Sequence, residues 1–234
     1  MPEEPSALAA ALPDDARWVY ARSLLLAGAA QVRSSAAGDG ALVLDETTAV
    51  LVGHADPQLL RDSLAGQPGR SLLLEEDALA AVGAALPGWV PQPFVVHVHP
   101  APCLAGDQPP PSIVVSAPLD PTVLDELPAE LRDDHKGSPA AALSVVDGVP
   151  VAVCAVSDLT ETLWDVGVDT VDSARRQGHA TAAFLALAGV MAGQGRQPVW
   201  AAYEDYPPSL EMAKRLGFRP VTRMVELVPP NHET

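Results

Sequence analysis

The segment from Arg175 to Thr181 has the residue types of a phosphate-binding turn. Arg175 and Arg176 precede Gly178, and the segment lies between a strand predicted over 163–170 and a long apolar helix predicted from about 174 to 193. Free N–H groups and the positive end of a helix attract an anion, and glycine lets a phosphate approach the backbone closely. The other interpretation is an arginine-rich helix start that is simply exposed to solvent.

Two further groups of residues have metal or thiol chemistry available to them. His97 and His99 lie two apart in a predicted strand, so both rings point to one face, as in a metal site. No third ligand lies nearby in the sequence, so we expect an exposed strand face and no metal. Cys103 and Cys154 cannot form a disulfide framework, and we expect Cys154 to be a buried structural thiol in the apolar run VPVAVCAVS.

The charge balance excludes several classes of partner. The 234 residues include 14 Lys and Arg against 30 Asp and Glu, a net charge of −16. Nucleic acids and anionic lipid surfaces are held mainly by basic side chains, so we expect neither a nucleic acid nor a membrane as partner. The longest apolar stretch is shorter than a membrane span, and the N-terminus MPEEPS is acidic, unlike a signal peptide. These features predict a soluble, cytoplasmic protein.

Composition and proline positions predict two domains. The chain is 48% hydrophobic but only 4% aromatic, so its core must consist of Ala, Val and Leu. Among the 24 prolines, the run 106–112 is the best linker. We therefore expect an N-terminal α/β domain over residues 1–110 and a second domain over 111–234.

Hydrophobic periodicity predicts the elements of each domain. In the first, we expect helices at 14–33, at 56–66 with Asp56 as its N-cap, and at 77–86, a strand pair at 41–54, and strands at 71–76 and 93–99. In the second, we expect two strands joined by a turn at Asp147 and Gly148, a third strand at 162–171, and then the long helix. A strand at 198–204, a helix beginning near Pro208 and ending at Gly217, and a last strand complete the order β-β-β-α-β-α-β.

The turn and its surroundings resemble the acetyl-CoA motif of the GNAT superfamily of N-acetyltransferases. That motif is Q/R-x-x-G-x-G/A, and Arg175, Gly178 and Ala180 match its three defining positions. The following strand and the helix that closes on Leu-Gly-Phe at 216–218 also match, as do Pro198 and Trp200 in a bacterial branch with an additional N-terminal α/β domain. The resemblance covers roughly residues 116–228.

The resemblance implies the fold class α+β, a mixed α/β fold. Its GNAT-type splayed mixed sheet is flanked by helices and preceded by a smaller α/β domain. The activity implied is transfer of an acetyl group from acetyl-CoA to a primary amine by direct attack, without a metal. A backbone N–H near Val168 would polarise the thioester carbonyl. The residues implied to bind the cofactor are Val168, Asp169, Thr170, Arg175, Arg176, Gln177, Gly178, His179 (through its backbone N–H), Ala180, Thr181 and Ser209.

The sequence departs from the family at the position of the usual general acid. Ala213 stands where a tyrosine is common, and Tyr206 replaces a common asparagine. Acidic and phenolic residues nearby are the substitutes, with Asp165 or Asp169 as base, directly or through water. The catalytic residues that we predict are Asp165, Glu204 and Tyr206, with Tyr203 and Asp205 as further candidates. Each also has a structural interpretation as a solvated strand or turn residue.

Function therefore has two main interpretations. The first is the acetyltransferase, whose acceptor would be a small-molecule or peptide amine, cationic if the acidic charge surrounds the acceptor site. The second is a GNAT-like module that binds CoA or acyl-CoA without turnover, as a sensor or interaction domain. A third is a structural domain without a ligand. The N-terminal domain could be a degenerate second copy of the fold, a substrate lid, or the surface of a homodimer.

Overall fold

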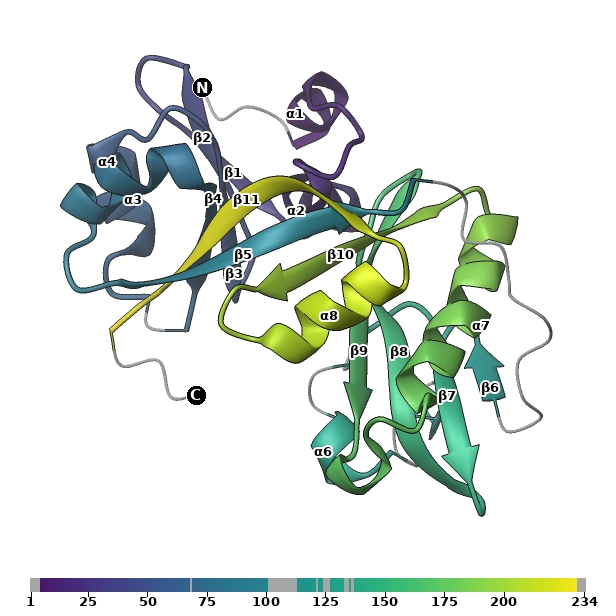
Figure 1. Cartoon of the computed structure of the whole chain (residues 1–234). Helices are drawn as coiled ribbons and strands as arrows, with labels where there is room; N and C mark the ends of the chain where they lie inside the picture. Colours follow the sequence, from purple (N-terminus) through teal and green to yellow (C-terminus); the bar gives the residue numbers. More distant parts are fainter. Residues whose placement is uncertain are drawn as a thin grey trace. The chain divides into compact units, whose positions relative to one another are not determined.

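The computed structural model describes residues 5–67, 69–100, 113–120, 122–123, 127–132, 135 and 137–230. The chain forms two compact units, one of Met1–His97 with Ala201–Thr234 and one of Val98–Trp200 (Figure 1). The predicted linker at 106–112 lies outside the described residues, so the boundary at 110 stays a prediction. The C-terminal residues from Ala201 onward belong to the same unit as the N-terminal residues. A single boundary in the sequence cannot produce this unit, because it is built from two separate stretches of the chain.

The first unit contains a mixed sheet in the order β1-β2-β3-β4-β11-β5. Its strands are β1 (Gln31–Ser34), β2 (Gly40–Leu44), β3 (Thr48–Gly53), β4 (Ser71–Glu75), β5 (Val90–Val98) and β11 (Arg219–Val228). The last residue of β5 belongs to the second unit. The helices are α1 (Pro5–Ala11), α2 (Val19–Ala27), α3 (Pro57–Leu64), the short η1 (Glu76–Ala78), α4 (Leu79–Ala85) and α8 (Pro207–Arg215).

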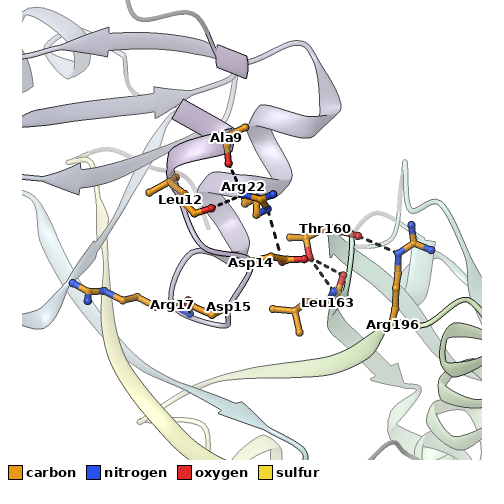
Figure 2. Close-up of polar contacts among 9 residues, drawn as sticks. All are labelled: Ala9, Leu12, Asp14, Asp15, Arg17, Arg22, Thr160, Leu163 and Arg196. Carbon is orange, nitrogen blue, oxygen red and sulfur yellow. Dashed lines mark hydrogen bonds and ion pairs between the residues drawn. The ribbon is translucent and has the colours of Figure 1, made fainter. Parts of the chain in front are cut away.

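Leucine and valine side chains from both ends of the sequence form the core of this unit. Leu60 of α3 and Val82 of α4 pack against Leu42, Leu72 and, on the C-terminal strand, Val225. β11 is antiparallel to β4, with Val225 opposite Leu74. At the other end of the unit, Arg22 of α2 donates hydrogen bonds to the carbonyls of Ala9 and Leu12 and so ties α1 to α2 (Figure 2).

The predicted elements of the first unit are confirmed with one exception. The helix expected over 14–33 spans only Val19–Ala27, because Gly28 is left-handed (φ 77°) and ends it. Residues 31–34 then form β1 instead of continuing the helix. The predicted Asp56 cap of α3 is confirmed, since its side chain accepts hydrogen bonds from the N–H groups of Gln58 and Leu59.

The second unit contains the strand order β10-β9-β8-β7-β6. The strands are β6 (Ile113–Ser116), β7 (Ala141–Val146), β8 (Val149–Leu159), β9 (Leu163–Thr170) and β10 (Gln197–Tyr203), whose last three residues belong to the first unit. The helices are α6 (Ala129–Arg132), the short η3 (Asp172–Ala174) and α7 (His179–Gly193). Both units thus combine helices with a mixed sheet, which confirms the predicted fold class. The turn at Asp147 and Gly148 is also confirmed, with φ values of 50° and 81°.

Helices cover both faces of the strands of the second unit. On one face, α7 packs across β7, β8 and β9 (Figure 1). On the other, Leu127 and Leu131 of the α6 segment pack against Leu143 and Val153. Since side chains alternate along a strand, each β9 side chain faces one of these two layers.

An aromatic cluster joins α7 to the start of β9. Phe184 of α7 stacks on Trp164 at 6.2 Å and meets Trp200 edge-on at 5.8 Å, and all three are at most 1% exposed. Such contacts add to the free energy of burial. Among the described residues, no helix has the length and apolar character that crossing a lipid bilayer requires.

Replacing Phe184 by Ala should destabilise the second unit. The substitution removes a buried ring from between two indoles and leaves a cavity, so we expect a loss of about 3–5 kcal/mol. Urea unfolding followed by tryptophan fluorescence measures it, because Trp164 and Trp200 are the contact partners. The control is Leu26→Ala, since that side chain is 44% exposed. An equal effect of the two substitutions would contradict the packing role.

Candidate functional site

Strand β9 has a different pairing on its two sides. On one side β8 pairs with it antiparallel from Trp164 to Thr170. On the other, the parallel register with β10 extends over three pairs and ends where Asp165 lies opposite Val199. From Val166 to Thr170, that edge of β9 has no strand partner in the described part of the chain. The N–H and C=O groups that point to this edge are therefore available to an extended ligand, except that the carbonyl of Thr170 accepts a 3.4 Å hydrogen bond from Nε of Arg175.

Hydrogen bonds around Thr160 hold the paired start of β9 in place. The Nε group of Arg196 donates to the carbonyl of Thr160 at 3.0 Å (Figure 2), and the N–H of Gln197 donates to the carbonyl of Thr162 at 2.8 Å. The N–H of Leu163 donates to the Thr160 hydroxyl at 2.9 Å. These hydrogen bonds thus fix the first part of the parallel pairing between β9 and β10, which does not continue beyond Asp165.

The residues between β9 and α7 form a turn with two left-handed positions. Arg176 has φ 61° and Gly178 has φ 91°. Left-handed residues cannot continue a helix, so the helix predicted from 174 begins at His179 instead, after the short η3. A Cβ added at Gly178 would meet no atom within 4 Å, so the turn opens to empty space at this glycine.

The backbone of this turn presents unpaired donors. The first backbone bond of α7 runs from the N–H of Ala182 to the carbonyl of Gly178. Within the described residues, the N–H groups from Arg176 to Thr181 donate to no backbone carbonyl. Left-handed residues next to a helix start form a concave group of donors that suits an anion, and the helix dipole adds positive potential.

The side chains of the turn have distinct partners. Arg175 lies 3.0 Å from Asp172, and both are exposed. Gln177 donates to the carbonyl of Ser173 at 3.0 Å. The ring of His179 makes a 2.9 Å hydrogen bond with the buried hydroxyl of Ser144, so the ring contacts β7 and the backbone N–H remains at the turn. The turn thus combines a free backbone with exposed guanidinium groups.

Comparison with known proteins identifies the fold. A GCN5-related N-acetyltransferase-like protein from Streptococcus suis 89/1591 is 16% identical, with a TM-score of 0.67 over 95% of this chain and 96% of its own. A GCN5-related N-acetyltransferase from Kribbella flavida is 20% identical, with a TM-score of 0.65 over 99% and 97%. The chain has the GNAT fold. An acetyltransferase of the GNAT family from Colwellia psychrerythraea, 15% identical, has a TM-score of 0.56 over 94% and 91%.

The similarity lies in structure and not in sequence. No protein-family model matches the sequence, and no curated protein matches it either. The likeness to the GNAT structures covers nearly the whole chain, so the N-terminal part is included in it. At these identities the comparisons establish the GNAT fold, and the roles of individual residues stay predictions.

The three predicted catalytic residues fall in different units. Asp165 lies in the second unit and is only 7% exposed. Glu204 and Tyr206 lie in the first unit, after the end of β10. Glu204 forms a bidentate ion pair with Arg223, whose Nε and Nη2 donate to Oε1 and Oε2 of Glu204, both at 2.9 Å, and Nη1 of Arg223 also lies 2.9 Å from the Glu76 carboxylate. Glu204 is therefore held by a cation that sequence reasoning did not identify.

Helix α8 carries the positions at which the sequence departs from the GNAT pattern. Ala213 is completely buried, so its side chain belongs to the core of the first unit. Tyr206 precedes the helix and is 48% exposed. Ser209, predicted to contact the cofactor, lies in the first turn, where its N–H donates to the carbonyl of Tyr206. Gly217 has φ 91° and ends the helix as predicted.

Tyr203 at the end of β10 is tied to Glu226. Its hydroxyl donates a hydrogen bond to the Glu226 carboxylate on β11, and its ring meets Phe94 at 5.9 Å. Burial, and then the hydrogen bond to Glu226, raise the pKa of Tyr203 well above its ordinary value. Tyr203 therefore stays neutral at physiological pH, and its proton is directed to the Glu226 carboxylate.

One residue near β9 was missed by sequence analysis. His135, which follows α6, makes a 2.9 Å contact with the carboxylate of Asp169. Nothing in its local sequence marks it, because its sequence neighbours are charged residues and it stands 34 positions before its partner. Only the packing of the α6 segment on the sheet brings the two together.

The predicted metal and thiol residues have ordinary surroundings. The exposed strand face expected at the two histidines is wrong, because His97 is buried in β5 and His99, which follows the end of that strand, is partly buried. In the described ranges, no three His, Cys, Asp or Glu side chains form a group able to hold a metal. Cys154 is buried as predicted, and burial raises the pKa of its thiol. Cys103 lies outside the described residues.

Stability at alkaline pH should depend on Tyr203. Because folding raises the pKa of this phenol above about 10, its contribution is fully present below that pH and is lost as the pH rises further. We expect the free energy of unfolding of the wild type to fall more steeply above pH 10 than that of Tyr203→Phe. Urea unfolding at pH 8 and above pH 10 measures both slopes. Equal slopes would contradict the assignment.

Proposed function

We propose that the protein transfers an acetyl group from acetyl-CoA to a primary amine. The observation that carries the proposal is the turn from Arg176 to Thr181, whose N–H groups donate to no backbone carbonyl among the described residues. This turn connects the end of β9, which is paired with β8 but not with β10, to the start of α7. A strand edge leading into such an anion site suits a ligand with an extended amide-bearing arm and a pyrophosphate. The GNAT fold supports the same assignment.

The turn would hold the pyrophosphate. The backbone N–H groups from Arg176 to Thr181 would donate to its oxygens, with Arg175 and Arg176 supplying charge. The fit is supported by the empty space at Gly178, where a side chain would otherwise stand against the phosphate. The ion pair of Arg175 with Asp172 is exposed on both sides, so exchanging it for a phosphate contact costs little.

The edge of β9 would hold the pantetheine arm and the thioester. The backbone of Val168, Asp169 and Thr170 would pair with the pantetheine amides, as an added strand would. A backbone N–H near Val168 would donate to the thioester oxygen as negative charge develops there. The acceptor nitrogen then forms a bond to the thioester carbon, the carbon–sulfur bond breaks, and the amine proton passes to a base. No enzyme nucleophile is required.

The acceptor is proposed by chemical class. A net charge of −16 favours a cationic acceptor such as a polyamine, an aminoglycoside or a lysine-bearing peptide. Asp165, Glu204 and Tyr206 stay predictions as proton-transfer residues. The cytoplasmic location and a homodimer stay predictions as well.

A second function is favoured by the surroundings of the acid and base candidates. Ala213 is buried in place of the usual tyrosine, Glu204 is held by Arg223, and Tyr203 donates to Glu226. A protein with these features would bind CoA or acyl-CoA as a sensor without turnover. Binding without a rate for any amine supports this function over the enzyme.

Acetyl-CoA and CoA should both bind, and binding should weaken with salt. Because the phosphates are held by N–H groups and exposed arginines, we expect micromolar affinity that falls as screening increases. Calorimetric titration at two salt concentrations measures it, followed by a screen of amines for acetylation. An absence of binding at both salt concentrations would contradict the acetyltransferase and the CoA-binding sensor alike.

Gly178→Val should reduce CoA affinity at least tenfold, equivalent to about 1.4 kcal/mol. The new side chain would occupy the open space of the turn and strain a left-handed residue. The matched control is Gly28→Val, because Gly28 also has a positive φ of 77° and open space but lies at the end of α2. Calorimetry measures affinity and circular dichroism the fold. Unchanged affinity in the folded Gly178 variant would contradict the placement of the pyrophosphate.

A further inference from the structure

His135 and Asp169 form a pair with unequal exposure. The Nε2 atom of His135 lies 2.9 Å from Oδ2 of Asp169, and the two side chains are 2% and 44% exposed. An ionised carboxylate only accepts hydrogen bonds, so the imidazole donates through Nε2–H. The buried ring therefore lies behind a carboxylate that reaches solvent.

The β9 backbone leaves room for this ring. Gly167 is two residues before Asp169 and faces the same layer. A Cβ added at Gly167 would lie 3.4 Å from Cε1 and 3.5 Å from Nδ1 of His135, and 2.6 Å from the Ser157 hydroxyl. The imidazole thus packs directly over the glycine, which a larger side chain would prevent.

The hydrogen bonding of the ring is directed to Asp169 alone. Nδ1 of His135 is buried and has no hydrogen-bond partner among the residues that the structure describes. Burying a polar group without a partner costs stability, and an apolar side chain would fill this space without that cost. The feature that histidine supplies here, and an apolar residue would not, is the donor to Asp169.

We propose that Asp169 accepts the proton of the acceptor amine and that His135 is the positioning residue that holds its carboxylate. This inference rests on the proposed acetyl transfer and names a base for it. In the step, the amine nitrogen bonds to the thioester carbon, the carbon–sulfur bond breaks, and the amine proton goes to Asp169. The leaving thiolate is protonated by solvent.

The environment favours Asp169 over the other carboxylates. Asp165, on the same strand face, is 7% exposed, and Glu204 is engaged by Arg223. Asp169 lies beyond the last β9–β10 pair, on the part of the strand whose edge is open to a ligand. On β8, the residue directly opposite Asp169 is the apolar Val153, and the buried thiol of Cys154, one position along, points to the other face of the sheet.

The test compares four variants using acetyl-CoA with the most reactive amine of a panel of spermidine, kanamycin and a lysine peptide. We expect Asp169→Asn to reduce kcat/KM at least a hundredfold and to remove the acid limb of the pH–rate profile. His135→Ala should reduce kcat about tenfold with unchanged acetyl-CoA affinity by calorimetry, because the carboxylate is misplaced while the backbone is kept. His135→Gln retains an N–H donor and should recover most of the rate. The exposed His54→Ala is the control.

The results distinguish a failure of the His135–Asp169 proposal from a failure of the proposed acetyltransferase activity. Full activity in His135→Ala, with wild-type turnover, would overturn the role of His135 alone. An acid limb that persists in Asp169→Asn would overturn Asp169 as the base and leave the acetyltransferase intact. An absence of wild-type turnover with every amine would overturn the proposed enzyme together with the pair. Because unfolding would also lower the rate, the melting temperature of each variant is measured, and recovery in His135→Gln identifies a hydrogen-bond effect.

Discussion

The incomplete pairing of β9 is the constraint on which the rest of the site depends. A strand inside a sheet normally has both edges occupied, and an edge without a partner needs a ligand or water. The parallel pairing of β9 with β10 ends where Asp165 lies opposite Val199, and the rest of β9 has no partner on that side among the described residues. The bonds from Arg196 and Gln197 fix the point at which the pairing stops.

The end of β9 leads directly into the turn, and the two features together define one kind of ligand. The turn requires left-handed backbone at Arg176 and Gly178, so the helix must begin late and with free donors. Arg176 is a residue other than glycine that is held in this left-handed conformation, which costs backbone strain. A strand edge followed by an anion site suits a long ligand that is amide-bearing at one end and phosphorylated at the other.

The sequence departs from the GNAT pattern most clearly at the positions where that pattern places its proton-transfer residues. The position of the usual tyrosine is a buried alanine, and the acidic and phenolic groups after β10 bond to Arg223 and Glu226. The carboxylate of Asp169 is half-exposed and is oriented by a buried histidine from a separate segment. A change in the residues that move protons, on an unchanged fold, is expected where function depends on sites and not on architecture.

The sequence by itself determined the local features of the protein. Most of the strands and helices, the Asp147–Gly148 turn, the Asp56 cap and the glycine of the turn before α7 follow from periodicity and from residues with special backbone preferences, whereas α1 and β1 do not. Tertiary structure decided the partners: β11 with β4, Arg223 with Glu204, Tyr203 with Glu226 and His135 with Asp169. Local pattern carries no information about which distant segment will pack on a given face, because that choice depends on how the whole sheet buries its apolar surface. For the same reason the C-terminal strand joined the unit of the N-terminal residues, whereas the helix predicted from 174 began at His179 because the backbone at Arg176 and Gly178 is left-handed.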